Sequence, residues 1–254
     1  MKKRDVILEK YYCINCGSQV KSLYKEYSPS VLKLTKCPSC KRIADKYVEY
    51  DLVIVVIDLI LLRIMAYRHI LLNSEFKIFW KISIGLIFLE TYSDWIFLKE
   101  SSSSRSLKDL NSTLFQNKDL IYQDDLKFYE MSIKTALGFS SFIIVAYFLT
   151  AGYSYLRKTE PVTFKVIWKA VALSTCGSIL LLPSLIWETY IQEFHVLFVS
   201  MYTTLSQLLA HKAISNSEKI WSLLVIFLAH VVKMFIMNTT LTQLVINSDY
   251  LIIK

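Results

Sequence analysis

Hydrophobic and polar positions divide this chain into a charged N-terminal part and a long, mainly apolar remainder. Up to Glu49 charged residues are frequent, and the stretches SQVKSLYKEY and SVLKLTK alternate apolar and polar residues around a Ser-Pro pair. Such alternation is typical of strands, so it predicts a β-hairpin. Beyond Glu49, apolar stretches recur that approach the roughly 20 residues of a bilayer-spanning helix. The pattern predicts a small β-rich head followed by an all-α, polytopic membrane domain.

One of the six apolar segments differs from the others. Leu52–Leu72 contains Asp58, Arg63, Arg68 and His69, and an arginine at mid-span costs roughly 2.5–3.5 kcal/mol on insertion scales. We therefore expect this segment to be an interfacial helix. The alternative is that it also spans, which would move the head to the lumen. The five expected spans are Ile78–Leu98, Thr135–Tyr155, Val166–Trp187, Phe194–Ala210 and Ile220–Met237.

These patterns predict three parts. Residues 1–50 form the head, residues 51–75 form the amphipathic interfacial helix, and residues 76–254 form the helical membrane domain. A polar loop at 99–130, which begins with SSSSRS, is expected inside the membrane domain. The apolar tail after Met237 either extends the last helix or lies on the membrane surface.

The distribution of charge predicts an orientation. The chain has a net charge of +8; the connections after Tyr155 and after Ala210 are basic, whereas the one around Glu188 has neither Lys nor Arg. Because Lys and Arg concentrate in cytoplasmic loops, we expect the head to be cytosolic and the C-terminus luminal. No apolar signal-peptide segment precedes the first cysteine, in agreement with a cytosolic head. The glycosylation sequons at Asn111 and Asn238 both fall on the luminal side of this arrangement.

Four cysteines in the head have the spacing of a metal site. Cys13, Cys16, Cys37 and Cys40 form two C-x2-C pairs separated by 20 residues, a spacing typical of four-thiolate zinc sites. Zn²⁺ prefers tetrahedral sulfur ligands, and four protein ligands leave no position for substrate. We therefore expect a zinc ribbon with one structural zinc ion. Two disulfides are the alternative, which a reducing cytosol disfavours.

Ionisable residues inside the apolar segments are candidate functional groups by default. Glu90 and Asp94 are four residues apart, and His230 and Lys233 are three apart, so each pair shares a helix face. The alternatives are contact with headgroups near a helix end for the first pair, and a hydrogen bond between helices or a snorkelling lysine for the second. The candidates for contact with a lipid headgroup are Arg63, Arg68 and His69.

The segment from Tyr11 to Asn73 closely resembles the homology domain of the Arv family. Beyond the cysteine pairs, the resemblance includes the stretches ADKYVEYD and AYRHILLN. It implies an endoplasmic-reticulum membrane protein of lipid homeostasis, linked to sterol distribution, sphingolipid balance and early glycosylphosphatidylinositol (GPI) anchor synthesis. Only the four cysteines carry over residue by residue, as metal ligands.

Several function classes remain open at this point. We favour a non-catalytic lipid-handling protein, because no catalytic triad or nucleotide-binding loop is recognisable. Its expected partners are membrane lipids (sterol, sphingolipid or GPI intermediates) and membrane proteins of lipid biosynthesis. The alternatives are a membrane-bound, acyltransferase-like enzyme with a histidine base, and a scaffold subunit of a GPI-biosynthesis complex. A nucleic-acid reader is disfavoured by the membrane segments and by acidic residues in the head.

Overall fold

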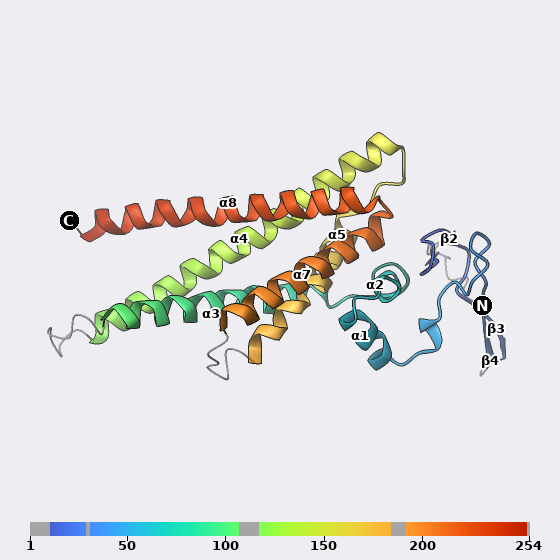
Figure 1. Cartoon of the computed structure of the whole chain (residues 1–254), viewed down its shortest axis with the longest axis horizontal. Coiled ribbons are helices and arrows are strands. Elements are labelled where there is room, and N and C mark those ends of the chain that lie inside the picture. The colour runs from blue at the N-terminus through green and yellow to red at the C-terminus, as the bar shows by residue number, and fades with distance from the viewer. Residues whose placement is uncertain (1–10, 29–30, 107–116, 184–191, 253–254) are drawn as a thin grey trace, which may run out of the picture.

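The computed structural model describes residues 11–28, 31–106, 117–183 and 192–252. Figure 1 shows a small head with short strands at one end of an elongated array of helices. Two short helices, α1 and α2, lie between the head and the longer helices. The expected order, a small β-containing head followed by helices, is confirmed.

The head contains two short antiparallel hairpins. β1 (Tyr11–Tyr12) pairs with β2 (Gln19–Val20), and β3 (Tyr24–Ser28) pairs with β4 (Val31–Leu34). The hairpin expected around the Ser-Pro pair is confirmed for β3 and β4. Its first strand was expected to begin further upstream, which is wrong, because β2 pairs back onto β1 and closes the turn that carries the first two cysteines.

The apolar segment after the head is broken into short helices. A 3₁₀ turn, η1 (Tyr47–Glu49), precedes α1 (Leu52–Ile60), α2 (Ile64–Arg68) and a π-helical turn, η2 (His69–Asn73). The break falls at Leu62, whose φ of +56° is left-handed and cannot continue a right-handed helix. The expectation of one continuous helix is therefore wrong.

Helix α1 has the length and surface of a helix that lies at an interface. Its nine residues extend about 14 Å at 1.5 Å per residue, which is less than half of the roughly 30 Å hydrocarbon core of a bilayer. Only Val55 and Asp58 of α1 are buried, and its exposed apolar side chains include Leu52, Val53 and Ile60. The interfacial position stays a prediction, and both observations agree with it.

Long helices make up the rest of the described chain. Their bounds are α3 (Phe79–Ser106), α4 (Asn117–Arg157), α5 (Phe164–Thr175) with the 3₁₀ turn η3 (Cys176–Leu181), α7 (Gln192–Ser215) and α8 (Lys219–Ile252). Most of the polar loop expected at 99–130 is helical, because α3 continues to Ser106 and α4 begins at Asn117. The apolar tail after Met237 extends α8. Asn238 lies within α8, and Asn111 lies outside the described residues.

The core of the helical domain lies where α4, α5 and α8 meet. Its buried side chains come from all three helices: Phe139, Phe142, Ile143 and Ala146, then Ile167 and Val171, then Val225, Ile226 and Ala229. Small alanines at two of these positions let α4 and α8 pack against each other where they cross (Figure 1).

Within the described residues, three helices are long and apolar enough to cross a membrane by length and composition. They are Lys127–Arg157, Phe164–Leu181 and Lys219–Thr239. The expected spans near Ile78–Leu98 and Phe194–Ala210 are helical, but the first contains Lys81, Glu90 and Asp94. The expected count of five spans is therefore not confirmed.

The head and two helix connections meet at one end of the helical domain (Figure 1). Arg68 of α2 donates a 3.1 Å hydrogen bond to Oδ1 of Asn216, between α7 and α8. Arg157 at the end of α4 pairs with Glu218 at 3.1 Å. The predicted orientation places the head and both connections on one side of the membrane, and this proximity agrees with it. Which compartment they face stays a prediction.

Candidate metal centre and its contact with the helices

Two turns of the same design present the four cysteines. In the first, the Gly17 amide donates to the Cys13 carbonyl and the Cys13 amide donates to Ser18. In the second, the Lys41 amide donates to the Cys37 carbonyl and the Cys37 amide donates to Arg42. The fifth residue of each turn is left-handed, with φ of +79° at Gly17 and +59° at Lys41. Only the first turn uses glycine, the residue that adopts this conformation without steric cost.

The four thiols have the geometry of a single tetrahedral site. All four Sγ atoms lie within 4.8 Å of one another. The Cys13–Cys40 and Cys16–Cys37 Sγ atoms are each 3.7 Å apart, close to the roughly 3.8 Å that tetrahedral geometry gives for metal–sulfur bonds of about 2.3 Å. All are free cysteines, so the disulfide alternative is not adopted. The residues present fit one metal ion.

Hydrogen bonding distinguishes the thiols from one another. Burial raises the pKa of Cys13 to about 11. Burial also acts on Cys37, but hydrogen bonds from the Ser18 hydroxyl and from the backbone of Cys40 and Ser39 outweigh it and lower the pKa to about 6. Ser18 Oγ lies 2.8 Å from Cys16 Sγ and 3.3 Å from Cys37 Sγ. A bound metal deprotonates its thiol ligands, and Ser18 is placed to stabilise two of the resulting thiolates.

Arg68 connects the first cysteine turn to the helices. Its Nη1 donates to the carbonyls of Ile14 (3.1 Å) and Asn15 (2.7 Å), and its Nη2 donates to Asn216. The side chain is buried, which lowers its pKa, and attraction to Cys16 and Cys13 opposes that shift. Four thiolates and one divalent ion carry a net charge of −2, so Arg68 is a countercharge to the occupied site.

A second group of hydrogen bonds converges on Asp45, which is fully buried. Its Oδ1 accepts from the Tyr47 amide at 3.0 Å, and its Oδ2 accepts from His69 Nδ1 at 2.8 Å and from Asn73 Nδ2 at 2.7 Å. Asn73 also pairs with the backbone of Tyr12. His69 and Asn73 of η2 are therefore hydrogen-bonded to the head through the carboxylate of Asp45.

The residues expected to hold a lipid headgroup are engaged with the protein. Arg68 is 4% exposed, and a lipid phosphate could reach it only if its hydrogen bonds opened. His69 is committed to Asp45. Arg63 pairs with Asp58 at 3.0 Å and its side chain is half-exposed, so it alone keeps a surface free for a headgroup. The headgroup contact stays a prediction for Arg63, whereas Arg68 and His69 hydrogen-bond to the head.

The intramembrane candidates link different helices. Lys233 of α8 donates to Glu90 of α3 at 2.5 Å, and Asp94 lies within electrostatic range of both. His230 of α8 hydrogen-bonds to Gln207 of α7 at 2.7 Å. For His230 and Lys233 these contacts correspond to the alternative of hydrogen bonds between helices. Contact with headgroups stays a prediction for Glu90 and Asp94.

Several residues of the junction between head and helices were not singled out from the sequence. Tyr47 donates a 2.6 Å hydrogen bond to Asp58 Oδ2, and both are buried. Asn73, Asp45 and Asn216 also contribute. Three of these five residues, Asp45, Tyr47 and Asn73, lie in the stretches ADKYVEYD and AYRHILLN, which were the signal that could have identified them.

The head has one four-thiol site that fits a metal ion, and it is hydrogen-bonded to a domain of long apolar helices. These features define the class: a membrane-associated protein with a small metal-binding domain. The model of the Arv1-like family matches residues 12–211. The chain belongs to this family.

Relatives from several organisms match this chain, two of them over most of its length. Protein ARV1 of Mus musculus is 34% identical over 222 residues, which cover 85% of this chain and 78% of the relative. Protein ARV1 of Homo sapiens is 37% identical over 179 residues, covering 70% and 62%. Protein ARV1 of Candida albicans is 48% identical over 62 residues, covering 24% of this chain and 21% of the relative. No solved structure matches significantly.

Proposed function

We propose that this chain is a multi-pass endoplasmic-reticulum protein that acts without catalysis in lipid homeostasis. Its task is the distribution of sterol, with effects on sphingolipids and on GPI-anchor intermediates. The observation that supports this most is the junction: Arg68 and Asn73 hold a closed four-thiol head against the membrane helices. Such a head is a rigid element at the membrane surface, and the family resemblance supplies the link to lipids.

In this proposal the metal is zinc, bound by Cys13, Cys16, Cys37 and Cys40. Zinc fits a tetrahedral set of four thiolates, and iron is the other common metal for this ligand set. Four protein ligands leave no open coordination position. The ion therefore supplies folding free energy to a head of about fifty residues, which has too little core to be secure alone.

A non-catalytic role agrees with the positions of three histidines. His69 is bonded to Asp45, His211 to Thr150 and His230 to Gln207. The carboxylate of Asp45 and the hydroxyl of Thr150 are fully buried, and Gln207 is buried as well. This arrangement disfavours the acyltransferase-like alternative, in which a histidine serves as base.

Complementation of cells that lack their own Arv1-like protein tests the proposal. The full chain should restore the normal partition of sterol between the endoplasmic reticulum and the plasma membrane. The Cys37→Ser variant should fail, because it removes a metal ligand. Cys176→Ser is the matched control, since Cys176 lies outside the four-thiol cluster, and it should complement fully. Unchanged sterol partition in cells with and without the full chain would contradict the proposal.

A further inference from the structure

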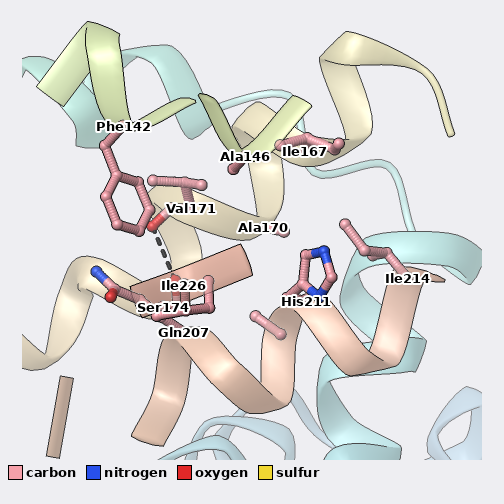
Figure 2. A pocket seen from close by; sticks show the side chains of 11 residues that line it. Phe142, Ala146, Ile167, Ala170, Val171, Ser174, Gln207, His211, Ile214 and Ile226 are labelled. Atoms are coloured by element: carbon pink, nitrogen blue, oxygen red, sulfur yellow. Dashed lines mark hydrogen bonds between the residues drawn. The ribbon is translucent and has the colours of Figure 1, made fainter. Parts of the chain in front are cut away.

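We propose that the helical domain contains a binding site for the hydroxyl group of an uncharged ligand, with Nδ1 of His211 as the hydrogen-bond acceptor. The site lies among α4, α5, α7 and α8, away from the metal centre. Figure 2 shows the His211 imidazole projecting among apolar side chains of these helices. The remaining lining comes from Phe142, Ala146, Ile167, Ala170, Val171, Ser174, Gln207, Ala210, Ile214 and Ile226.

The hydrogen bond on the other side of the ring determines the tautomer of His211. Thr150 Oγ1 lies 2.6 Å from the Ala146 carbonyl and 2.9 Å from His211 Nε2. A carbonyl only accepts, so the single hydroxyl hydrogen of Thr150 is donated to Ala146. Thr150 must then accept from His211, which places the ring hydrogen on Nε2. Nδ1 therefore carries a lone pair.

That lone pair has no partner within the described part of the chain. Nδ1 of His211 is buried without a hydrogen bond, and the residue is only 3% exposed. The other polar side chains of the pocket are already engaged: Ser174 donates to Val171 at 3.0 Å, and Gln207 bonds to His230 and Thr175. An unpaired polar atom in such a site costs about 1–3 kcal/mol, so a donor is favoured there.

The pocket selects the class of donor. Its lining is almost entirely apolar, and burying an unpaired charge in it would be costly. The free space is about 10 Å³, which is about the volume that one water-sized oxygen requires. The site therefore takes a neutral O–H group, and a ligand larger than water places only its hydroxyl there.

Two sources can supply this hydroxyl, an internal water or the alcohol of a membrane lipid. His211 lies four residues before the end of α7 at Ser215, about 6 Å along the helix axis, and that end lies near the head. A hydroxyl near the end of a helix at the membrane surface matches the depth at which an amphiphilic alcohol keeps its polar group. The choice of a lipid alcohol rests on the proposed function; the hydroxyl site itself does not.

The test is ¹⁵N NMR of the histidine rings in the full-length protein reconstituted in nanodiscs. We expect a neutral His211 with hydrogen on Nε2 and an Nδ1 resonance shifted by an accepted hydrogen bond. The His211→Gln variant assigns the signal. Thr150→Val removes the acceptor for Nε2 and should abolish the preference for this tautomer. His230, whose Nε2 bonds to Gln207, is the internal control and should not change.

Two probes then separate the sources. A long-chain alcohol and its methyl ether, which has no O–H, are added to lipid-free protein in detergent. An Nδ1 shift that is present before addition and unchanged by either probe identifies water. A shift that appears with the alcohol and not with the ether identifies a lipid alcohol. A protonated Nδ1, or an Nδ1 without a hydrogen bond under every condition, overturns the proposal, whatever complementation shows.

Discussion

The side-chain amide of Asn73 pairs with both backbone polar groups of Tyr12. Asn73 Oδ1 accepts from the Tyr12 amide at 2.9 Å, and Asn73 Nδ2 donates to the Tyr12 carbonyl at 2.8 Å. A single side chain thus hydrogen-bonds β1 as a neighbouring strand would. The residues are 61 positions apart, and the contact fixes the head relative to η2.

Asn73→Asp should loosen this contact. The aspartate keeps an acceptor for the Tyr12 amide, but it loses the donor to Tyr12 and to Asp45 and faces the buried Asp45 carboxylate. We expect a loss of about 2–3 kcal/mol in the stability of the docked head. By hydrogen exchange, protection of the Tyr12 amide should fall roughly 30- to 150-fold.

The matched control is Asn15→Asp, because the half-buried Asn15 donates its side-chain amide to the Ile43 carbonyl and to Cys13 Sγ rather than to Tyr12. Exchange at Tyr12 should change little in this variant. Equal loss of protection in both variants would mean that Asn73 has no special role in docking the head.

Arg68 should stabilise both the docked head and the bound metal. Lysine cannot reproduce the planar fork that reaches Ile14, Asn15 and Asn216, so Arg68→Lys should lower protection of the head amides, and Arg68→Met should lower it further. Loss of the countercharge near the thiolates should also weaken metal retention, by about 10–100-fold for a residue that supports the ligands. Competition with a chelator measures this.

Arg42→Met serves as the control for charge alone. Arg42 is an exposed residue next to the second cysteine turn, so its removal changes the net charge without breaking the junction. Metal retention should stay close to that of the unsubstituted protein. If Arg42→Met and Arg68→Met weakened metal binding equally, only the overall charge would matter.

The two cysteine turns should respond in opposite ways to glycine exchange. The left-handed conformation of Lys41 is sterically unfavourable for a residue with a Cβ, so Lys41→Gly should stabilise its turn by about 0.5–1 kcal/mol. Gly17→Ala should destabilise the first turn, because a Cβ would be strained at this φ and would lie 3.2 Å from Asn216 Oδ1. Exchange of the Lys41 and Gly17 amides reports each effect, and a destabilising Lys41→Gly would contradict the account.

Tyr47 should make the junction sensitive to alkaline pH. Burial and the hydrogen bond to Asp58 raise the pKa of the Tyr47 phenol above its ordinary value of 10.0. The stabilisation is therefore fully present below about pH 10, the pKa of an exposed tyrosine, and is lost as the pH rises further. Tyr47→Phe should cost about 1.5–3 kcal/mol at neutral pH, the range for a hydrogen bond to a charged group.

The measurement is the difference in stability of the junction between Tyr47→Phe and the unsubstituted protein, obtained from hydrogen exchange at amides of the head. This difference should shrink as the pH rises above 10. A difference that stays constant across that range would contradict the role given to the phenol.

The parts of the structure that were predictable from sequence depend on local spacing. The four cysteines can be recognised because each pair must lie in one tight turn, and long apolar runs indicate helices whatever they contact. The partners of Arg68 could not be predicted in this way, since Ile14 lies 54 residues away and no periodicity identifies a contact at that distance. An arginine in an apolar stretch suggested a headgroup ligand, whereas both terminal nitrogens of Arg68 donate to protein oxygens.

The break at Leu62 and the extent of α3 and α4 were missed for a related reason. The apolar pattern continues through Leu62, and it does not encode the contacts that α1 and α2 make with the head and with α7. The stretch SSSSRS has the composition of a loop, yet it forms the end of α3. Local composition disfavours a helix at such a stretch, and continuity with a long helix outweighs it.

Native mass spectrometry of the full-length protein, extracted in mild detergent, tests the central claim most directly. The claim is that one metal ion holds the four thiols and folds the head onto the membrane helices. The account predicts one zinc ion per chain in the unsubstituted protein and in Cys176→Ser, and none in Cys37→Ser. The account would be contradicted by a fully reduced chain that carries no metal and whose head amides at the Arg68 and Asn73 contacts are still protected from hydrogen exchange.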